Sequence, residues 1–181
     1  MKILALHGYH MSGKIIASMS TPLLKRIDYN INLITPDAPY LIKNKIVPDI
    51  TTHFGPPYYQ WFDKYKIVNI DKLKSIDNID GIIGFSQGAY ISSIITPYLK
   101  PKFIICIAGM DYNIINKIID IPSFHIIGKN DPLFYRSIDL TKKFKNPYIV
   151  YHEGGHHFPK DVQIYTKLNN FIKKIITPII K

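Results

Sequence analysis

Cysteine is nearly absent from the sequence, and so are long apolar runs. Cys106 is the one cysteine among 181 residues, so the chain cannot build a framework of disulfide bonds. It lies inside the apolar run 103–110, where we expect a buried and unreactive thiol. No apolar run approaches the roughly 20 residues of a membrane-spanning helix, and the run after Met1 is too short for a secretory signal peptide. We therefore expect a cytoplasmic protein without a membrane span.

Acidic residues and arginine are also scarce. The chain has 13 Asp and Glu residues against 23 Lys and Arg, a formal net charge of +10, and its only arginines are Arg26 and Arg136. A nucleic-acid-binding surface would gather its basic residues on one helix or ribbon, whereas these lysines are spread along the chain. The frequent Ile, Lys, Asn, Tyr and Phe are typical of low-GC coding bias. We therefore predict no nucleic-acid partner.

The chain is rich in apolar residues that fall into short, regular groups. Hydrophobic residues make up 46% of it, enough for the core of one domain over residues 1–181. Strands are expected at 2–6, 30–35, 81–85, 102–108, 123–127 and 148–151. Helices are expected from Ser12, again from Thr21-Pro22, within 61–79, after Ser86 and ended by Pro97 and Pro101, and at 113–119, 133–144 and about 165–175. This alternation predicts an α/β fold, a doubly wound and mainly parallel sheet of about six strands flanked by helices, without a separate cap domain.

One pentapeptide, Gly84-Phe85-Ser86-Gln87-Gly88, stands between a predicted strand and a predicted helix. Gly-x-Ser-x-Gly is common by chance, but in this context it predicts a nucleophile elbow, a sharp turn that exposes the serine hydroxyl. Ligands of open parallel sheets bind beyond the carboxyl ends of the strands. Asp131 and His156 follow two later strands, and the order Ser86, Asp131, His156 is the triad order of α/β hydrolases.

Each of these residue types suits a role in acyl transfer. A serine hydroxyl becomes a good nucleophile only when a base takes its proton, and an imidazole such as His156 can do so near neutral pH. Asp131 would orient that imidazole. Asp111 also follows a strand and competes with Asp131 for this role, and His157 stands beside His156.

The backbone N–H groups of Tyr9 and Gln87 are the expected donors of the oxyanion hole. Gln87 begins the helix after the serine, and Tyr9 lies in the loop after the first strand. No pair of histidines or carboxylates has the spacing of a metal site, so we predict no metal and no cofactor.

Residues 40–59 form an irregular, proline-containing excursion with many aromatic side chains. These side chains fill the core in one reading, and in another they form an apolar wall for an acyl or aryl group. The candidate substrate-binding residues are Tyr40, Phe54, Tyr58, Trp61 and Phe62.

A competing motif lies near the N-terminus. The segment from Gly8 to Lys14 fits Gly-x4-Gly-Lys and stands between a strand and a helix, as a phosphate-binding P-loop does. However, Ile15 follows Lys14, where a P-loop needs Ser or Thr to hold magnesium. Nucleotide binding is therefore the minor alternative.

Taken together, these blocks resemble the FSH family of serine hydrolases, a branch of the α/β hydrolases. The matching blocks are Leu6-His7-Gly8-Tyr9, Ser12-Gly13-Lys14, Asp37-Ala38-Pro39, Trp61-Phe62, the segment 80–89, Ser92-Ser93, Gly128, Asp131 and Gly154-Gly155-His156 before Pro159. The Gly-Lys pair of the competing motif is among them. The chain is shorter than typical members between Asp37 and Gly81 and after Gly109, which leaves the size of the substrate open.

The resemblance implies a carboxylesterase or thioesterase acting on a small-molecule substrate with a hydrophobic acyl or aryl group. Ser86, Asp131 and His156 then correspond to the triad, and Tyr9 and Gln87 to the oxyanion donors. A non-catalytic binding protein with a hydrolase fold is the second hypothesis. A binding module would have no need for all three triad side chains at the strand ends.

Overall fold

A six-stranded parallel sheet forms the centre of the protein. The computed structural model describes residues 1–43, 54–63, 68–113 and 116–177, and the strands lie in the order β2-β1-β5-β6-β7-β8. Every neighbouring pair is parallel, which confirms the predicted sheet. The strands are β1 (Lys2–Leu6), β2 (Asn32–Ile34), β5 (Gly81–Phe85), β6 (Phe103–Ile107), β7 (Ser123–Gly128) and β8 (Pro147–His152).

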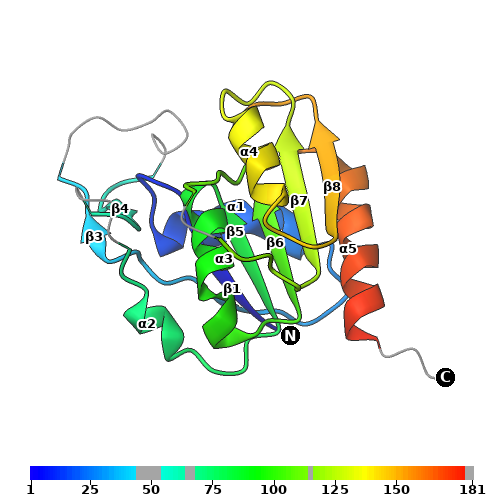
Figure 1. Cartoon of the computed structure of the whole chain (residues 1–181), viewed down its shortest axis with the longest axis horizontal. Helices are drawn as coiled ribbons and strands as arrows, with labels where there is room; N and C mark the ends of the chain where they lie inside the picture. The colour runs from blue at the N-terminus through cyan, green and yellow to red at the C-terminus, as the bar shows by residue number, and fades with distance from the viewer. Residues whose placement is uncertain (44–53, 64–67, 114–115, 178–181) are drawn as a thin grey trace.

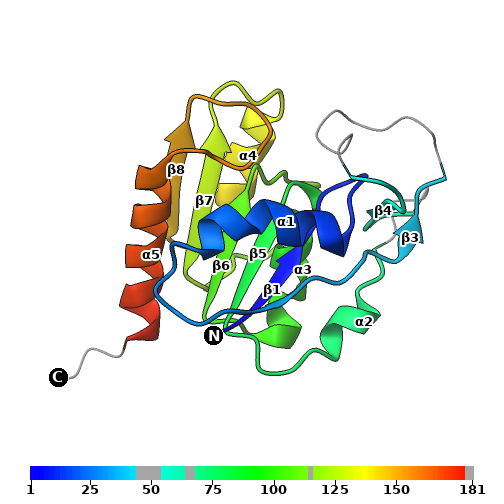
Figure 2. The same ribbon diagram turned by 180° about the vertical axis from the view of Figure 1, so that it is seen from behind.

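Helices cover both faces of the sheet. Helices α1 (Gly13–Leu24) and α5 (Val162–Ile176) lie on one face, and α3 (Gln87–Leu99) and α4 (Phe134–Thr141) lie on the other (Figure 1 and Figure 2). Each face encloses its own buried apolar cluster. Strands β5, β6 and β7 are consequently buried at every residue, as strands covered on both faces must be.

The strand order reverses between β1 and β5. From β1 the chain passes outward to β2 and then returns to pair β5 with the other side of β1, so that Leu6 is opposite Gly84. Ligand sites of open α/β sheets lie at such a reversal, beyond the carboxyl ends of the two strands. The loop with Tyr9 and the turn with Ser86 both start there.

The stretch 61–79 contains a helix, as predicted, and that helix is short, Asp71–Lys74 (α2). Other local predictions were wrong: none of the described residues in 113–119 is helical. Residues 64–67, 114 and 115 lie outside the description. A single helix, α1, runs through Thr21-Pro22, where a second helix was expected to start, and Pro22 stands in its last turn. Helix α3 ends at Leu99, between the two prolines expected to end it, before a left-handed Lys100 with φ 46°.

The irregular excursion contains a small element that the sequence did not predict. Strands β3 (Tyr40–Leu41) and β4 (Tyr59–Gln60) form a two-stranded antiparallel sheet of their own. The described residues contain no separate cap domain. No helix in the described part of the chain has the length and apolar character to cross a membrane.

Candidate active site

Ser86 lies in a sharp turn between β5 and α3. Its backbone has φ 53° and ψ −116°, a conformation that costs a non-glycine residue about 1–3 kcal/mol. Two glycines make room for the turn. A Cβ atom on Gly84 would lie 2.4 Å from the Ala89 Cα, and one on Gly88 would lie 2.1 Å from the Leu6 carbonyl oxygen. Helix α3 therefore lies close against β5 and β1, with Ser86 at its first turn.

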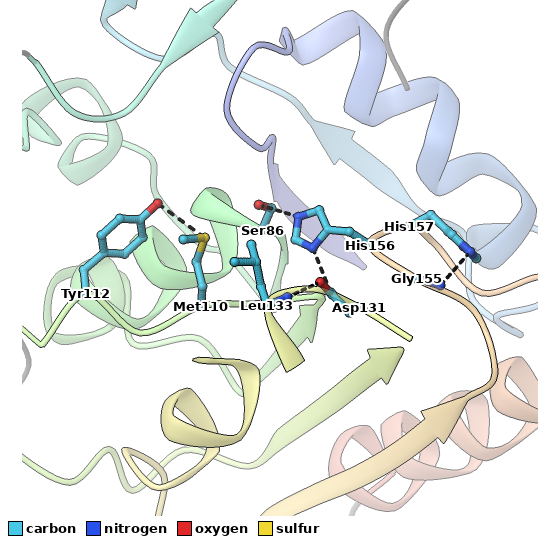
Figure 3. Close-up of polar contacts among 8 residues, drawn as sticks. All are labelled: Ser86, Met110, Tyr112, Asp131, Leu133, Gly155, His156 and His157. Atoms are coloured by element: carbon cyan, nitrogen blue, oxygen red, sulfur yellow. Dashed lines mark hydrogen bonds and ion pairs between the residues drawn. The ribbon is translucent and has the colours of Figure 1, made fainter. Parts of the chain in front are cut away.

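A series of hydrogen bonds connects Ser86 with His156 and Asp131 (Figure 3). The Ser86 Oγ is 2.8 Å from the His156 Nε2, and the His156 Nδ1 is 2.7 Å from the Asp131 Oδ2. The Asp131 side chain is fully buried, and its Oδ1 accepts a 2.7 Å bond from the Leu133 N–H. Because the carboxylate can only accept, the His156 Nδ1 carries the hydrogen and donates a hydrogen bond to Asp131. The Nε2 is then left to accept from the serine hydroxyl.

Three different strand ends supply these side chains. Ser86 follows β5, Asp131 follows β7 after the turn at Gly128, and His156 follows β8. The last two loops touch directly, because a Cβ on Gly128 would lie 2.4 Å from the Gly155 carbonyl oxygen. The Phe85 ring lies 5.3 Å from the His156 ring, which supports the imidazole from the strand side. The side chains of Ser86, Asp131 and His156, from three separate loops, are thus brought together.

The loop after β1 is held by His7. Its Nδ1 donates to the Gly8 carbonyl over 2.7 Å, and its Nε2 accepts from the Ala38 N–H over 3.0 Å. Burial lowers the pKa of His7 to about 4, so the imidazole is neutral at pH 7, as this bonding requires. The Trp61 indole donates to the His7 carbonyl over 2.8 Å. His7 therefore orders the loop that presents Tyr9.

The side chain of Gln87 fixes the start of α3. Its Oε1 accepts from the Trp61 N–H over 2.8 Å, and the side chain also interacts with the Tyr112 hydroxyl. Both Tyr9 and Gln87 line a cavity of about 400 Å³ that opens beside Ser86.

The walls of this cavity are mostly apolar. They are formed by Met11, Phe85, Met110 and Leu133, together with Tyr9, Gln60, Ser86, Gln87, Tyr112 and His156. None of the five aromatic residues proposed as substrate-binding lines it. Phe62 lines a neighbouring cavity, Trp61 and Tyr58 are buried in the apolar clusters, and Tyr40 and Phe54 are half-buried.

Sequence reasoning named Tyr9, Ser86, Gln87 and His156 and missed the other residues that line the cavity, although a signal for some of them was present. Met110 and Tyr112 follow β6, and Met11 lies in the loop after β1. All three therefore stand at strand ends, by the same rule that selected Ser86, Asp131 and His156.

The structure shows where the two competing side chains, Asp111 and His157, make their hydrogen bonds and ion pairs. The Asp111 carboxylate lies 3.4 Å from the Lys143 ammonium and accepts from the Asn113 N–H, so its bonds are not with His156. The His157 Nδ1 donates to the Phe158 carbonyl, and its Nε2 accepts from the Gly155 N–H (Figure 3). Both nitrogens of His157 therefore bond to the backbone.

The P-loop alternative loses its support at Gly13. A phosphate-binding loop must leave its N–H groups open to the ligand, but the Gly13 N–H donates to the Asp37 Oδ1 over 2.7 Å. A carboxylate of the protein thus already lies where a phosphate would bind. In the described ranges, no group of three His, Cys, Asp or Glu side chains could hold a metal ion.

A parallel sheet flanked by helices, with a serine at the elbow after β5 and a hydrogen-bonded histidine and aspartate, defines an α/β hydrolase. The chain belongs to the serine hydrolase family FSH1, whose family model matches residues 1–168.

Known proteins similar to this chain agree with that assignment. Esterase OVCA2 of Xenopus tropicalis is 27% identical, over 98% of this chain and 94% of its own length. An esterase of Aedes aegypti is 29% identical, over 88% of this chain and 70% of its own. The crystal structure of esterase PE8 superimposes with a TM-score of 0.62 at 19% identity, covering 97% of this chain and 92% of that one, and shows a shared fold. The OVCA2 alignment spans 219 residues, more than the 181 of this chain, so the relative has segments that this chain lacks.

Proposed function

We propose that the protein hydrolyses carboxylic esters through Ser86, His156 and Asp131, with an acyl-enzyme intermediate. The proposal rests on one observation, the two hydrogen bonds of 2.8 and 2.7 Å that run from Ser86 through His156 to Asp131. The esterase names of the relatives support the same reaction class.

In the first half of the reaction, the Ser86 Oγ forms a bond to the ester carbonyl carbon while its proton passes to the His156 Nε2. The resulting imidazolium is stabilised by Asp131, which keeps its negative charge. When the tetrahedral intermediate collapses, the bond between carbon and the alcohol oxygen breaks. His156 gives its proton to the departing alcohol, and the acyl group remains on Ser86.

The second half repeats these steps with water. His156 removes a proton from a water molecule, whose oxygen attacks the acyl carbon. The bond to the Ser86 Oγ then breaks, the serine regains its proton from His156, and the carboxylic acid leaves. In both halves, the N–H groups of Tyr9 and Gln87 would donate to the oxyanion. Removing one such donor costs other hydrolases about 10²–10³ in kcat.

The cavity beside Ser86 favours an apolar substrate group. Met11, Phe85, Met110 and Leu133 form most of its wall, and its volume of about 400 Å³ suits a short acyl chain or a phenyl ring. A thioester would react by the same steps, with a thiolate as the leaving group. Phe62, of the five aromatic residues expected at the substrate site, lines the adjoining cavity and is the one we retain as a substrate contact.

The decisive experiment is labelling with a fluorophosphonate probe. We expect the wild type to be labelled and Ser86→Ala to remain unlabelled, with both proteins folded by circular dichroism. A folded wild type that takes up no probe, or a variant labelled equally well, would favour the non-catalytic binding protein. A panel of p-nitrophenyl esters of rising chain length would then define the acyl preference, and S-butyrylthiocholine with thiol detection would test thioesters.

A further inference from the structure

A second cavity adjoins the one beside Ser86. Its volume is about 670 Å³, and it shares Gln87 and Tyr112 with the first cavity. The two differ in chemistry, because Asp111, Asn113 and Arg136 bring charged and polar groups to the second wall. An ester bound at Ser86 can therefore reach an apolar space on one side and a polar space on the other.

Arg136 is the unusual member of this wall. It is one of two arginines in the chain, and it projects from α4, the helix that follows the Asp131 turn. Within the described residues, its guanidinium has neither a hydrogen bond nor an ion pair. Its charge is near enough to Tyr112 to oppose the rise that burial causes in the pKa of that phenol. Arg136 thus lines the cavity as an exposed residue whose guanidinium donors are unused.

The carboxylates of the same wall form ion pairs with lysines. Asp111 lies 3.4 Å from Lys143, and Asp139 lies 2.7 Å from Lys142. These pairs leave the Arg136 charge uncompensated in the polar cavity. A guanidinium presents a planar fork of N–H donors that matches the two oxygens of a carboxylate.

We propose that Arg136 is a specificity-determining residue that binds a carboxylate on the substrate, so that the preferred substrates are half-esters of dicarboxylic acids. This inference rests on the proposed ester hydrolysis at Ser86. A group with a single negative charge fits better than a phosphate monoester, which carries about −1.5 to −2 and would lie beside Asp111 and Asp139. The ester carbonyl would lie at Ser86, with the alcohol group in the apolar cavity and the carboxylate at Arg136.

The test compares substrates that differ only in that charge. Monobenzyl esters of succinate, glutarate, adipate and pimelate are each paired with the benzyl ester in which a methyl group replaces the carboxylate. Released benzyl alcohol is measured by chromatography. We expect at least one half-ester to exceed its neutral partner about tenfold in kcat/KM, mainly through a lower KM, as for a charge-assisted hydrogen bond. The preference should shrink at 0.5 M NaCl, because salt screens a partly exposed pair.

Two variants distinguish the effect of Arg136 from the effect of the protein's net charge. Arg136→Met should abolish the preference for the half-ester while kcat/KM for the neutral ester stays within threefold. Arg26→Met removes the same charge at a site where the arginine lies over the Tyr165 ring, outside both cavities, and should keep the preference. If none of the four half-esters is preferred, or if Arg136→Met keeps the preference, the inference is wrong.

The failure of this inference differs from a failure of the proposed function. An enzyme that cleaves neutral benzyl esters and takes up the fluorophosphonate, but shows no half-ester preference, retains the proposed function and refutes the role of Arg136. A protein that cleaves neither class and takes up no probe refutes both.

Discussion

The N–H of Gly155 donates a 3.2 Å hydrogen bond to the Nε2 of His157, immediately before the histidine that bonds Ser86. The His157 Nδ1 donates onward to the Phe158 carbonyl over 2.8 Å. The His157 side chain therefore bonds to the backbone on both sides of the His156–His157 pair and fixes the loop; its bond with Gly155 is drawn in Figure 3.

His156 and His157 should consequently respond differently to substitution. We expect His156→Ala to lower kcat for p-nitrophenyl butyrate by at least 10³-fold, because it removes the base. His157→Leu removes only the bridge and should cost about tenfold. In His157→Gln the amide can accept from Gly155 and donate to Phe158, so most activity should return. A larger loss in His157→Leu than in His156→Ala would assign the base to His157 instead.

A second pair of variants distinguishes the roles of Asp131 and Asp111. Asp131→Asn should lower kcat by about 10³–10⁴-fold, because an amide at this position favours the wrong tautomer of His156. Asp111→Asn should keep kcat for a neutral ester within tenfold of the wild type. It should instead lower the free energy of unfolding by about 1–3 kcal/mol, because it removes the buried negative charge that lies 3.4 Å from the Lys143 ammonium. Steady-state kinetics and urea unfolding of both variants provide the measurement.

The loops of Asp131 and His156 are in contact at Gly128, so a substitution of Gly128 should change both stability and activity. A Cβ there would lie 2.4 Å from the Gly155 oxygen and 2.5 Å from the Gly154 oxygen, so the two loops must move apart. We expect Gly128→Ala to lose about 1–3 kcal/mol of stability and at least tenfold in kcat. Gly55→Ala is the matched control, because its Cβ would meet nothing within 4 Å. Equal thermal midpoints and equal rates for the two variants would contradict this prediction.

The strained turn at Ser86 should lower the stability of the fold. Glycine adopts φ 53° and ψ −116° without the penalty of a side chain. Ser86→Gly should therefore unfold at higher urea than Ser86→Ala, by a free energy of about 1 kcal/mol. Both variants lack the hydroxyl and should be inactive, so the difference reports the backbone alone. An alanine variant as stable as the glycine variant would show that the turn stores no strain.

Two buried histidines predict loss of stability in acid. Burial lowers the pKa of His7 to about 4 and that of His125 to about 3, whereas in the unfolded chain both titrate near 6.5. The unfolded chain therefore binds more protons as the pH falls from about 6.5 to 4. In this window each histidine should cost about 3 kcal/mol of stability. Urea unfolding followed by the fluorescence of Trp61, the one tryptophan, measures the slope.

The variant His125→Leu tests whether His125 contributes to this dependence of stability on pH. Without the second imidazole, the loss of stability between pH 6.5 and 4 should be about half as steep. The neutral side chain also removes the 3.1 Å contact with the Ser123 hydroxyl, so the comparison must use the slope rather than the absolute stability. A wild-type stability that does not change with pH in this window would contradict the prediction.

The sheet could be predicted because its signals are local. Each of its strands is a short apolar run, and in a parallel α/β sheet the ends of these runs meet at one edge. That rule selected Ser86, Asp131 and His156 without any tertiary information. It could not choose between Asp131 and Asp111, because both follow strands, and only the packing of the loop after β8 against the loop after β7 separates them.

Weaker local signals predicted less of the structure. Ile70, Leu73 and Ile76 have helical spacing, but only Asp71–Lys74 forms a helical turn. Apolar residues three positions apart occur in a single helical turn as well as in a long helix, so the spacing does not give the length of the helix. The flanking residues Asn69 and Asp77 favour turns. The two-residue strands β3 and β4 are too short to leave a periodic pattern. Met11 and Tyr112 also stand at strand ends, but they were not selected from the sequence, because neither residue type indicates a binding role by itself.

The pairing of β1 with β5 has a consequence for refolding. The loop with Tyr9 follows β1 and the turn with Ser86 follows β5, and the paired residues Leu6 and Gly84 lie 78 positions apart in the chain. Parallel pairings across such distances in the chain form slowly, because their loops must close before any contact rewards them. The helices α3 and α5 can gain structure earlier from local contacts. In a refolding experiment, the recovery of esterase activity should therefore lag behind the recovery of helical circular dichroism.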